Sequence, residues 1–200
     1  MVSTMDHGSL RTRMTPALPA GLVEHIDRVV TLAGQLAVAH DLDDDATERL
    51  LLTAQGHDVL RALDDAELLR RAEAQAIEVD PVERAEPVLL HGPLGATDLC
   101  DRFAVCDPWV EHAIRWHTTG HPDFDRDAWV FFLADKLEPW KVEHRPELAP
   151  LLDAAWELPE RAALEYLALN LAHGARLGWQ PHPMALRTGE ALRERGFARL

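Results

Sequence analysis

Cysteine, basic charge and long apolar runs are all scarce in this chain of 200 residues. Its two cysteines, Cys100 and Cys106, have a spacing that matches neither a zinc-binding motif nor a redox motif. We therefore expect both to be small, reduced core residues of a cytoplasmic protein. No apolar run approaches the roughly 20 residues of a spanning helix, so we expect no interaction with a membrane interior.

The low basic content also limits the partners. The chain has 20 Lys and Arg against 34 Asp and Glu, a net charge of −14. Nucleic acids and anionic membrane surfaces are bound by basic patches, so we expect neither as a partner. A small polyanionic ligand remains compatible if positive charge is concentrated locally, which a metal ion does. Hydrophobic residues at 47% and charged residues at 27% are typical of a globular domain.

One domain is expected. Met1–Pro16 is polar and lacks the apolar segment of a signal peptide, so we place a flexible leader at residues 1–18 and the domain at 19–200. Within the domain, apolar residues recur with the period of a helix, which predicts an all-α fold. The longer predicted helices are 20–39, 46–62, 65–76, 109–117, 147–156, 160–177 and 184–197.

His57 and Asp58 are adjacent near the end of the predicted helix 46–62. A buried carboxylate without a partner is strongly disfavoured, so this pair needs compensation. A divalent cation provides it, and neutral imidazole with carboxylate suits Fe, Mn, Zn or Co. Two adjacent residues cannot complete a coordination sphere, so other parts of the chain must contribute. Arg61 either reaches the same site or is the solvated end of the helix, and the two readings are equally supported.

Three further polar residues are predicted to face the interior. His25 lies on the apolar stripe of helix 20–39, where a core histidine bonded to a carbonyl is the simpler reading. His117 continues the apolar stripe of helix 109–117, whereas His112 on the other flank is expected to face solvent. Asp135 ends the apolar run Trp129–Ala134, and a buried aspartate without a partner is rare.

His91 precedes Pro93, which suits the first position of a helix. A histidine just outside a helix N-terminus is either an incidental cap or a phosphate contact, and the sequence does not decide between them. The inward-facing polar residues come from five helices or helix starts, and metal sites in helical bundles are built in this way. The simpler alternative is that each one is satisfied separately. The full set is His25, His57, Asp58, His91, His117 and Asp135.

The order of these residues resembles the HD phosphohydrolase superfamily, which is named for the His-Asp doublet. More narrowly, the chain resembles the YqeK-type symmetrical bis(5'-nucleosyl)-tetraphosphatases over about residues 20 to 190. The segments that carry the resemblance are Ile77–Ala85, Leu89–Ala96, Ile114–Gly120 and Ala134–Pro139. It implies a single HD-type helical bundle with a central metal site.

The resemblance also implies a role for each matching residue. One or two divalent ions are expected, iron in the first place and manganese or cobalt as alternatives. The expected metal ligands are His25, His57, Asp58 and Asp135. His91, and His117 with Thr118, would contact the phosphates or help to hold a second metal.

This chain departs from the family pattern at several positions. Lys141 stands where the family normally has arginine, and it keeps the charge without the bidentate geometry. Arg61 stands where a lysine often follows the doublet. The stretch Met184–Gly189 lacks the expected C-terminal signature, and the resemblance implies that this region lines the nucleotide pocket.

The function that the resemblance implies is metal-assisted hydrolysis of a phosphoanhydride, with diadenosine tetraphosphate cut symmetrically into two ADP. Asp58 would orient or deprotonate the water, while His91, His117, Lys141 and Arg61 would neutralise phosphate charge. The alternatives are an HD phosphohydrolase acting on another nucleoside di- or triphosphate, and a catalytically quiet nucleotide-binding domain. The expected partners are the dinucleotide substrate and its ADP product, and a homodimer is left open.

Overall fold

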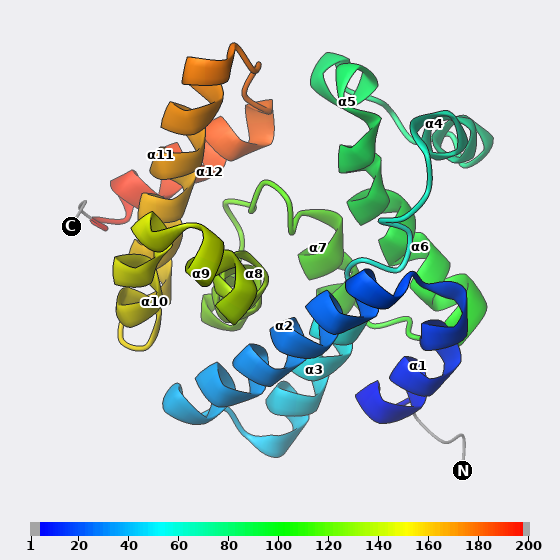
Figure 1. Cartoon of the computed structure of the whole chain (residues 1–200), viewed down its shortest axis with the longest axis horizontal. Coiled ribbons are helices and arrows are strands. Elements are labelled where there is room, and N and C mark those ends of the chain that lie inside the picture. Colours follow the sequence, from blue (N-terminus) through cyan, green and yellow to red (C-terminus); the bar gives the residue numbers. More distant parts are fainter. Residues whose placement is uncertain (1–4, 198–200) are drawn as a thin grey trace.

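The computed structural model describes residues 5–197, and each regular element within that range is a helix (Figure 1). The predicted all-α fold is confirmed. None of the helices described has both the length and the apolar character needed to cross a membrane. The α-helices are α1 (His7–Met14), α2 (Ala20–Ala39), α3 (Asp44–Gly56), α4 (Asp65–Ala74), α5 (Pro81–Ala85), α6 (His91–Phe103), α7 (Pro108–Arg115), α8 (Arg126–Leu137), α9 (Pro139–His144), α10 (Ala149–Ala155), α11 (Pro159–Leu177) and α12 (Pro183–Glu194). Short 3₁₀ helices are η1 (Thr15–Ala17), η2 (Pro87–Leu90) and η3 (Pro146–Leu148).

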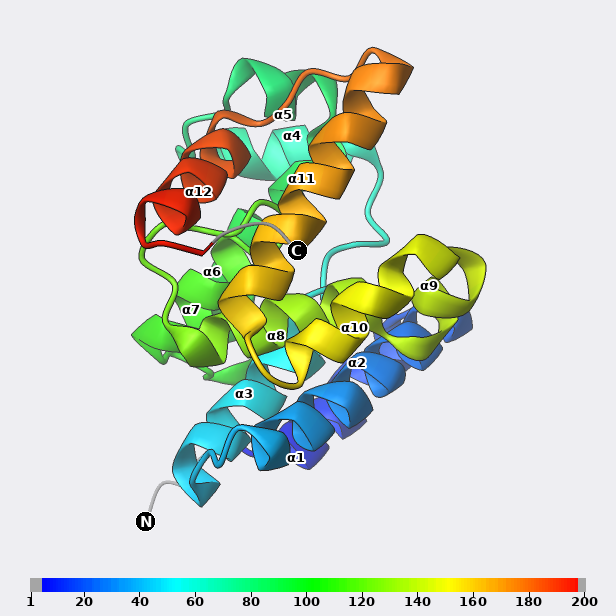
Figure 2. The ribbon, with the colours of Figure 1, turned by 90° about the vertical axis from the view of Figure 1, so that its left-hand side faces the viewer.

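Helix α8 lies in the middle of the bundle, with α2 and α3 on one side and α10 and α11 on the other (Figures 1 and 2). Its sequence has almost no polar face, and Trp129, Phe131 and Phe132 are each fully buried. A helix that is apolar all round must be enclosed by other elements. Asp135 is therefore carried into the interior by the helix that contains it.

A second apolar cluster fills the space between α1, α4 and α6, and it includes Leu68, Leu94 and Leu99. The His-Asp doublet joins the two clusters along the chain: Ala54 packs in the cluster around α8, whereas Val59 packs in the second. The metal-binding candidates are thus placed where two packed bodies meet. Apolar side chains lie on both sides of them.

The amino-terminal segment differs from the expected flexible leader. Within residues 1–18, α1 packs against α3, and Leu10 and Met14 are buried in the second cluster. Asp6 caps the helix by accepting from the Ser9 N–H at 2.7 Å. The prediction missed this because two apolar residues one turn apart are too few to show a helical period. Residues 1–4 lie outside the described part of the chain.

Helix α3 ends earlier than the predicted helix 46–62. It stops at Gly56, and His57 is its C-cap. A Cβ atom on Gly56 would lie 2.5 Å from Leu99 Cδ1, so glycine permits the close approach of α6. Helix α6 begins at His91, two residues before Pro93, because η2 leads directly into it. His57 was expected inside a helix and His91 just outside one, but each lies at the end of a helix.

The two cysteines are not reduced core residues as expected. Cys100 and Cys106 form a disulfide, and Cys106 is exposed. Ala104 ends α6 in the left-handed conformation (φ 59°), and the Val105 N–H donates to the Leu99 carbonyl. This reversal of the chain places the two Cα atoms 4.5 Å apart. The pairing depends on the helix cap, which the cysteine spacing does not reveal.

Candidate metal centre

The polar side chains predicted to face inward lie together. His25 comes from α2, Asp135 from α8, and the doublet from the turn after α3. His91 is the first residue of α6, and His117 follows α7. They form two groups, and within each group the candidate ligand atoms are all within 4.8 Å of one another. The groups are His25, His57 and Asp135, and Asp58, His91 and His117.

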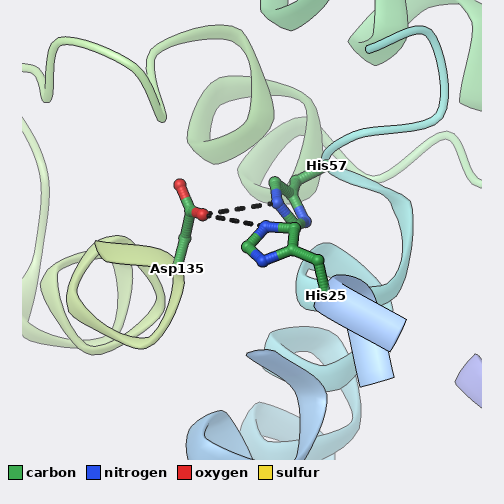
Figure 3. Close-up of side chains that lie close together, drawn as sticks. All are labelled: His25, His57 and Asp135. Atoms are coloured by element: carbon green, nitrogen blue, oxygen red, sulfur yellow. Dashed lines mark ion pairs between the residues drawn. The ribbon is translucent and has the colours of Figure 1, made fainter. Parts of the chain in front are cut away.

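In the first group, Asp135 reaches from α8 toward the two histidine rings (Figure 3). Its Oδ1 atom lies 3.3 Å from His25 Nε2 and 3.6 Å from His57 Nε2. Helix α2 and the end of α3 supply the histidines, so three separate elements must pack correctly before these atoms meet. The first group is therefore a product of the tertiary fold.

Asp58 belongs to both groups. Its Oδ2 atom lies 3.5 Å from His57 Nε2 and 3.7 Å from His25 Nε2. Its Oδ1 atom lies 3.0 Å from His91 Nε2 and 3.6 Å from His117 Nε2. Each oxygen of one carboxylate thus faces a different group. This arrangement is compatible with one ion or with two ions that share Asp58.

The backbone determines which histidine nitrogen faces the centre. His57 Nδ1 donates to the Ala54 carbonyl at 2.8 Å, and His117 Nδ1 donates to the Ile114 carbonyl at 2.7 Å. His91 Nδ1 bonds in the same way to the Val88 carbonyl. A carbonyl oxygen has two lone pairs, so it can accept a ring N–H even where, as at Val88 and Ile114, a backbone N–H also bonds to it. Each of these rings therefore presents the Nε2 lone pair to the centre, the usual state of a metal-bound histidine.

These lone pairs fit a cation. His57 Nε2 is buried and has no hydrogen-bond partner among the described residues. His91 Nε2 and His117 Nε2 lie 2.9 Å apart, although neither carries a hydrogen in the tautomers that their backbone bonds favour. A buried polar atom without a partner is costly, and facing lone pairs repel. Imidazole and carboxylate ligands in this number suit a divalent transition metal.

The charges around the site and its burial set the protonation states of the candidate ligands. Burial opposes ionisation of Asp58 and Asp135, but neighbouring histidines and lysines outweigh it and hold both carboxyl pKa values well below the ordinary value. Burial lowers the pKa of His117 to about 4, so its ring is neutral at neutral pH. Burial also acts on His57, but the two carboxylates outweigh it and raise the pKa of that ring. A proton and a metal ion therefore compete for His57 Nε2.

Three residues around the ligands were not assigned roles from the sequence. Glu138 is fully buried, accepts from Arg28 Nε at 2.7 Å, and lies 3.3 Å from His25 Nδ1. Lys136 Nζ donates to Asp135 Oδ2 at 2.6 Å. Carboxylates behind a ligating histidine orient the ring and raise its basicity. The one signal for Glu138 was its place in the segment Ala134–Pro139.

A cavity of about 580 Å³ opens onto the centre. Asp58 and His25 line it, together with Arg61 and Lys141. Lys141 Nζ also donates to Asp135 Oδ1 at 2.9 Å, whereas the guanidinium of Arg61 has no hydrogen-bond or ion-pair partner among residues 5–197. The structure thus places both predicted phosphate-binding cations at this cavity. The other three predicted phosphate contacts are not among the residues that line this cavity. His91 and His117 are buried in the second group with Asp58, and the half-buried Thr118 follows His117 in the chain.

The C-terminal stretch Met184–Gly189 does not contribute to the lining of this cavity. Thr188 is instead buried next to Gly120, where a Cβ atom would lie 3.0 Å from Thr188 Cγ2. Gly120 has a φ of 68°, and it ends the turn that carries His117 and Thr118. The expectation that this stretch lines the pocket is therefore wrong for the cavity at Asp58. Helix α12 supports the turn from behind.

Comparison with known proteins gives three consistent similarities. The family model described as HD domain matches residues 22–140. The symmetrical bis(5'-nucleosyl)-tetraphosphatase of Halalkalibacterium halodurans is 30% identical over 135 residues, 68% of this chain and 70% of that protein. The Staphylococcus aureus protein of the same name is 28% identical over 125 residues, 62% of each chain.

The fold is similar to that of a solved structure from Clostridium acetobutylicum, a protein described as a predicted HD superfamily hydrolase involved in NAD metabolism. The TM-score is 0.86 at 21% identity, and the match covers 96% of this chain and 100% of the other. At this level of identity the likeness concerns the arrangement of helices.

Proposed function

The chain belongs to the HD domain family, and on that premise we propose that it hydrolyses a phosphoanhydride bond of a nucleotide with the help of a divalent metal ion. The substrate we propose is diadenosine tetraphosphate, cut symmetrically into two ADP. Two relatives named as symmetrical bis(5'-nucleosyl)-tetraphosphatases support this choice. The negative charge of this substrate agrees with the cations that line the cavity.

The observation that carries the proposal is the shared position of Asp58. One carboxylate faces two groups of histidines, and the ring nitrogens of both groups present lone pairs toward it. Separately satisfied core histidines would each have their own partner. Here His57 Nε2 has none among the described residues. The arrangement supports a metal centre over a set of independent buried groups.

The residues proposed to hold the metal are His25, His57, Asp58 and Asp135. A bound divalent cation supplies a water of lowered pKa and polarises a phosphoryl oxygen. We propose iron as the native metal, with manganese or cobalt as alternatives. A second ion would use His91 and His117 together with the other oxygen of Asp58.

The chain's own residues position the substrate and manage charge. Asp58 is ionised and borders the cavity, so it can accept a hydrogen bond from the attacking water and orient it. The Arg61 side chain lines the cavity, pairs with none of the described residues and is available to a phosphate. Lys141 contributes positive charge while it holds Asp135 in place. In a one-ion site, His91, His117 and Thr118 would contact the phosphates from the other side of Asp58.

The test combines metal analysis with product identification. Protein purified without oxygen is analysed for bound metals, and diadenosine tetraphosphate is then supplied with iron, manganese or cobalt. We expect metal in the purified protein and ADP as the product. The double variant His57→Ala, Asp58→Ala should lose both metal and turnover, and full activity in this variant would refute the proposal.

A panel of nucleoside di- and triphosphates in the same assay tests the alternatives. Faster turnover of one of these would replace the proposed substrate with it. Nucleotide binding without turnover in any metal would identify a catalytically quiet domain.

A further inference from the structure

Trp140 is a large aromatic residue at the cavity that opens onto Asp58. It is the second residue of α9 and lines the cavity with 51% of its surface exposed. Exposed aromatic residues are common on protein surfaces, but Trp140 is the one among the described tryptophans that lines this cavity, where a flat ligand can stack on it. Trp140 lies between Glu138, which positions His25, and Lys141, which holds Asp135. The ring is therefore tied through the chain to the ligand residues.

One face of the Trp140 ring is already covered. The His144 ring stacks on it, with centroids 4.1 Å apart and an angle of 25° between the planes. His144 Nδ1 donates to the Trp140 carbonyl at 2.8 Å, which holds the imidazole in position. Trp140 is among the residues that line the cavity, whereas His144 is not. His144 thus stacks on one face of the Trp140 ring and leaves the other face without an aromatic neighbour among the described residues.

The same cavity also has cationic side chains in its lining, beside the acidic residues Glu24 and Glu138. Arg61 and Lys141 line it together with Asp58. A nucleotide has groups that suit both kinds of residue. Its base is flat and apolar on both faces and suits Trp140, while its anionic phosphates suit Arg61 and Lys141. A volume of about 580 Å³ lies in the usual range for small-molecule sites.

We infer that Trp140 binds one base of the nucleotide substrate by stacking, with His144 supporting the ring from behind. This inference rests on the proposed function, because it takes the nucleotide as the occupant of the cavity. Stacking uses the π-face that every base has, so Trp140 distinguishes a nucleotide from a phosphate compound that has no base. Trp140 is thus a specificity residue, and the cations hold the phosphates.

The experiment measures binding of ADP and of inorganic pyrophosphate by calorimetry to the purified full chain. Trp140→Ala should weaken ADP binding by about tenfold or more, the size of a base–aromatic stack, and change pyrophosphate binding by less than about twofold. Trp140→Phe keeps an aromatic face and should retain most of the ADP affinity. The Trp140 N–H that bonds Glu138 Oε2 at 2.9 Å belongs to the backbone, so these variants keep that contact.

Trp179→Ala is the matched control, because Trp179 is 55% exposed but does not line the cavity. It should leave ADP binding unchanged. Equal losses for ADP and pyrophosphate in Trp140→Ala, unchanged ADP binding in that variant, or wild-type protein that binds ADP no more tightly than pyrophosphate would each overturn the inference. Hydrolysis of diadenosine tetraphosphate, assayed in parallel, reports on the proposed function alone.

Discussion

His91 Nε2 and His117 Nε2 lie 2.9 Å apart in the interior, while each ring gives its Nδ1–H to a carbonyl three residues earlier in the chain. Two neutral imidazoles in these tautomers have no hydrogen to share between them. The nearest counter-group is Asp58 Oδ1, which is itself an acceptor and lies 3.0 Å from His91 Nε2. Only a cation or an added proton relieves this contact.

The first prediction is that a divalent metal stabilises the fold. At a metal concentration 100-fold above its dissociation constant, binding contributes about 2.7 kcal/mol. For a chain of this size the melting temperature should rise by about 5–10 °C. Thermal unfolding with chelator and with manganese measures this shift. The His57→Ala, Asp58→Ala variant should show no shift, and an equal rise there would point to binding elsewhere.

The second prediction concerns Glu138, whose carboxylate faces His25 Nδ1 and Arg28 Nε. Glu138→Gln keeps the shape but removes the charge that orients the ring and balances Arg28. We expect a metal affinity about 10- to 100-fold lower, the usual cost of losing such a partner. Metal titration against a competing chelator measures it. Glu24→Gln is the control, since Glu24 lines the same cavity and is exposed. A similar loss of metal affinity in both variants would show that the loss comes from the change in net charge and not from the contact with His25.

The third prediction concerns Gly92, which follows His91 in α6. A Cβ atom there would lie 2.9 Å from the Arg115 carbonyl oxygen and 3.4 Å from His117 Nδ1. Gly92→Ala must therefore push α6 away from the end of α7. We expect a net loss of about 1–3 kcal/mol, since overpacking outweighs the gain in helix propensity. Urea unfolding and metal content measure both effects.

Gly95→Ala is the matched substitution in the same helix, where the new Cβ atom would lie 3.4 Å from Val59 Cγ1. It should be tolerated much better than Gly92→Ala. If Gly92→Ala were neutral in both measurements, the close contact between α6 and α7 would not be needed to hold His91 beside His117.

The fourth prediction is a loss of stability in mild acid from His112 and His121, whose ring centroids lie 4.6 Å apart. Burial lowers the pKa of both rings, although nearby aspartates oppose it. A depressed histidine pKa means that stability is complete above the ordinary value of 6.5 and falls as the pH drops below it, because the unfolded chain takes up protons more readily. The groups that face them are Asp123, Asp125, Glu111 and Arg115.

Melting temperatures at several pH values between 7.5 and 5 measure this effect. The double variant His112→Phe, His121→Phe should show a smaller decrease than the wild-type chain over this range. A decrease of the same size would assign the acid sensitivity to other groups.

His112 was expected to face solvent, but its side chain is half-buried.

Much of the fold could be predicted because the deciding information is local. The apolar stripe over 20–39 matches α2 (Ala20–Ala39), and α11 (Pro159–Leu177) ends at Gly178 as its left-handed cap requires. Other features depend on distant contacts. Glu138 is buried because Arg28, 110 residues earlier, pairs with it. The disulfide depends on the backbone reversal at Ala104, a residue without a strong preference for that conformation.

The residue types of the candidate site could be predicted from the sequence. A histidine and an aspartate in apolar surroundings require a partner wherever they are buried, so the list of inward-facing ligands followed from hydrophobic patterning and the cost of burying charge. That these side chains bind a metal remains a prediction. How they meet could not be read from the chain. Helix ends selected the tautomers, packing divided the ligands into two groups, and Asp58 came to face both. These outcomes depend on distances between segments far apart in sequence, and those distances exist only after the helices have packed.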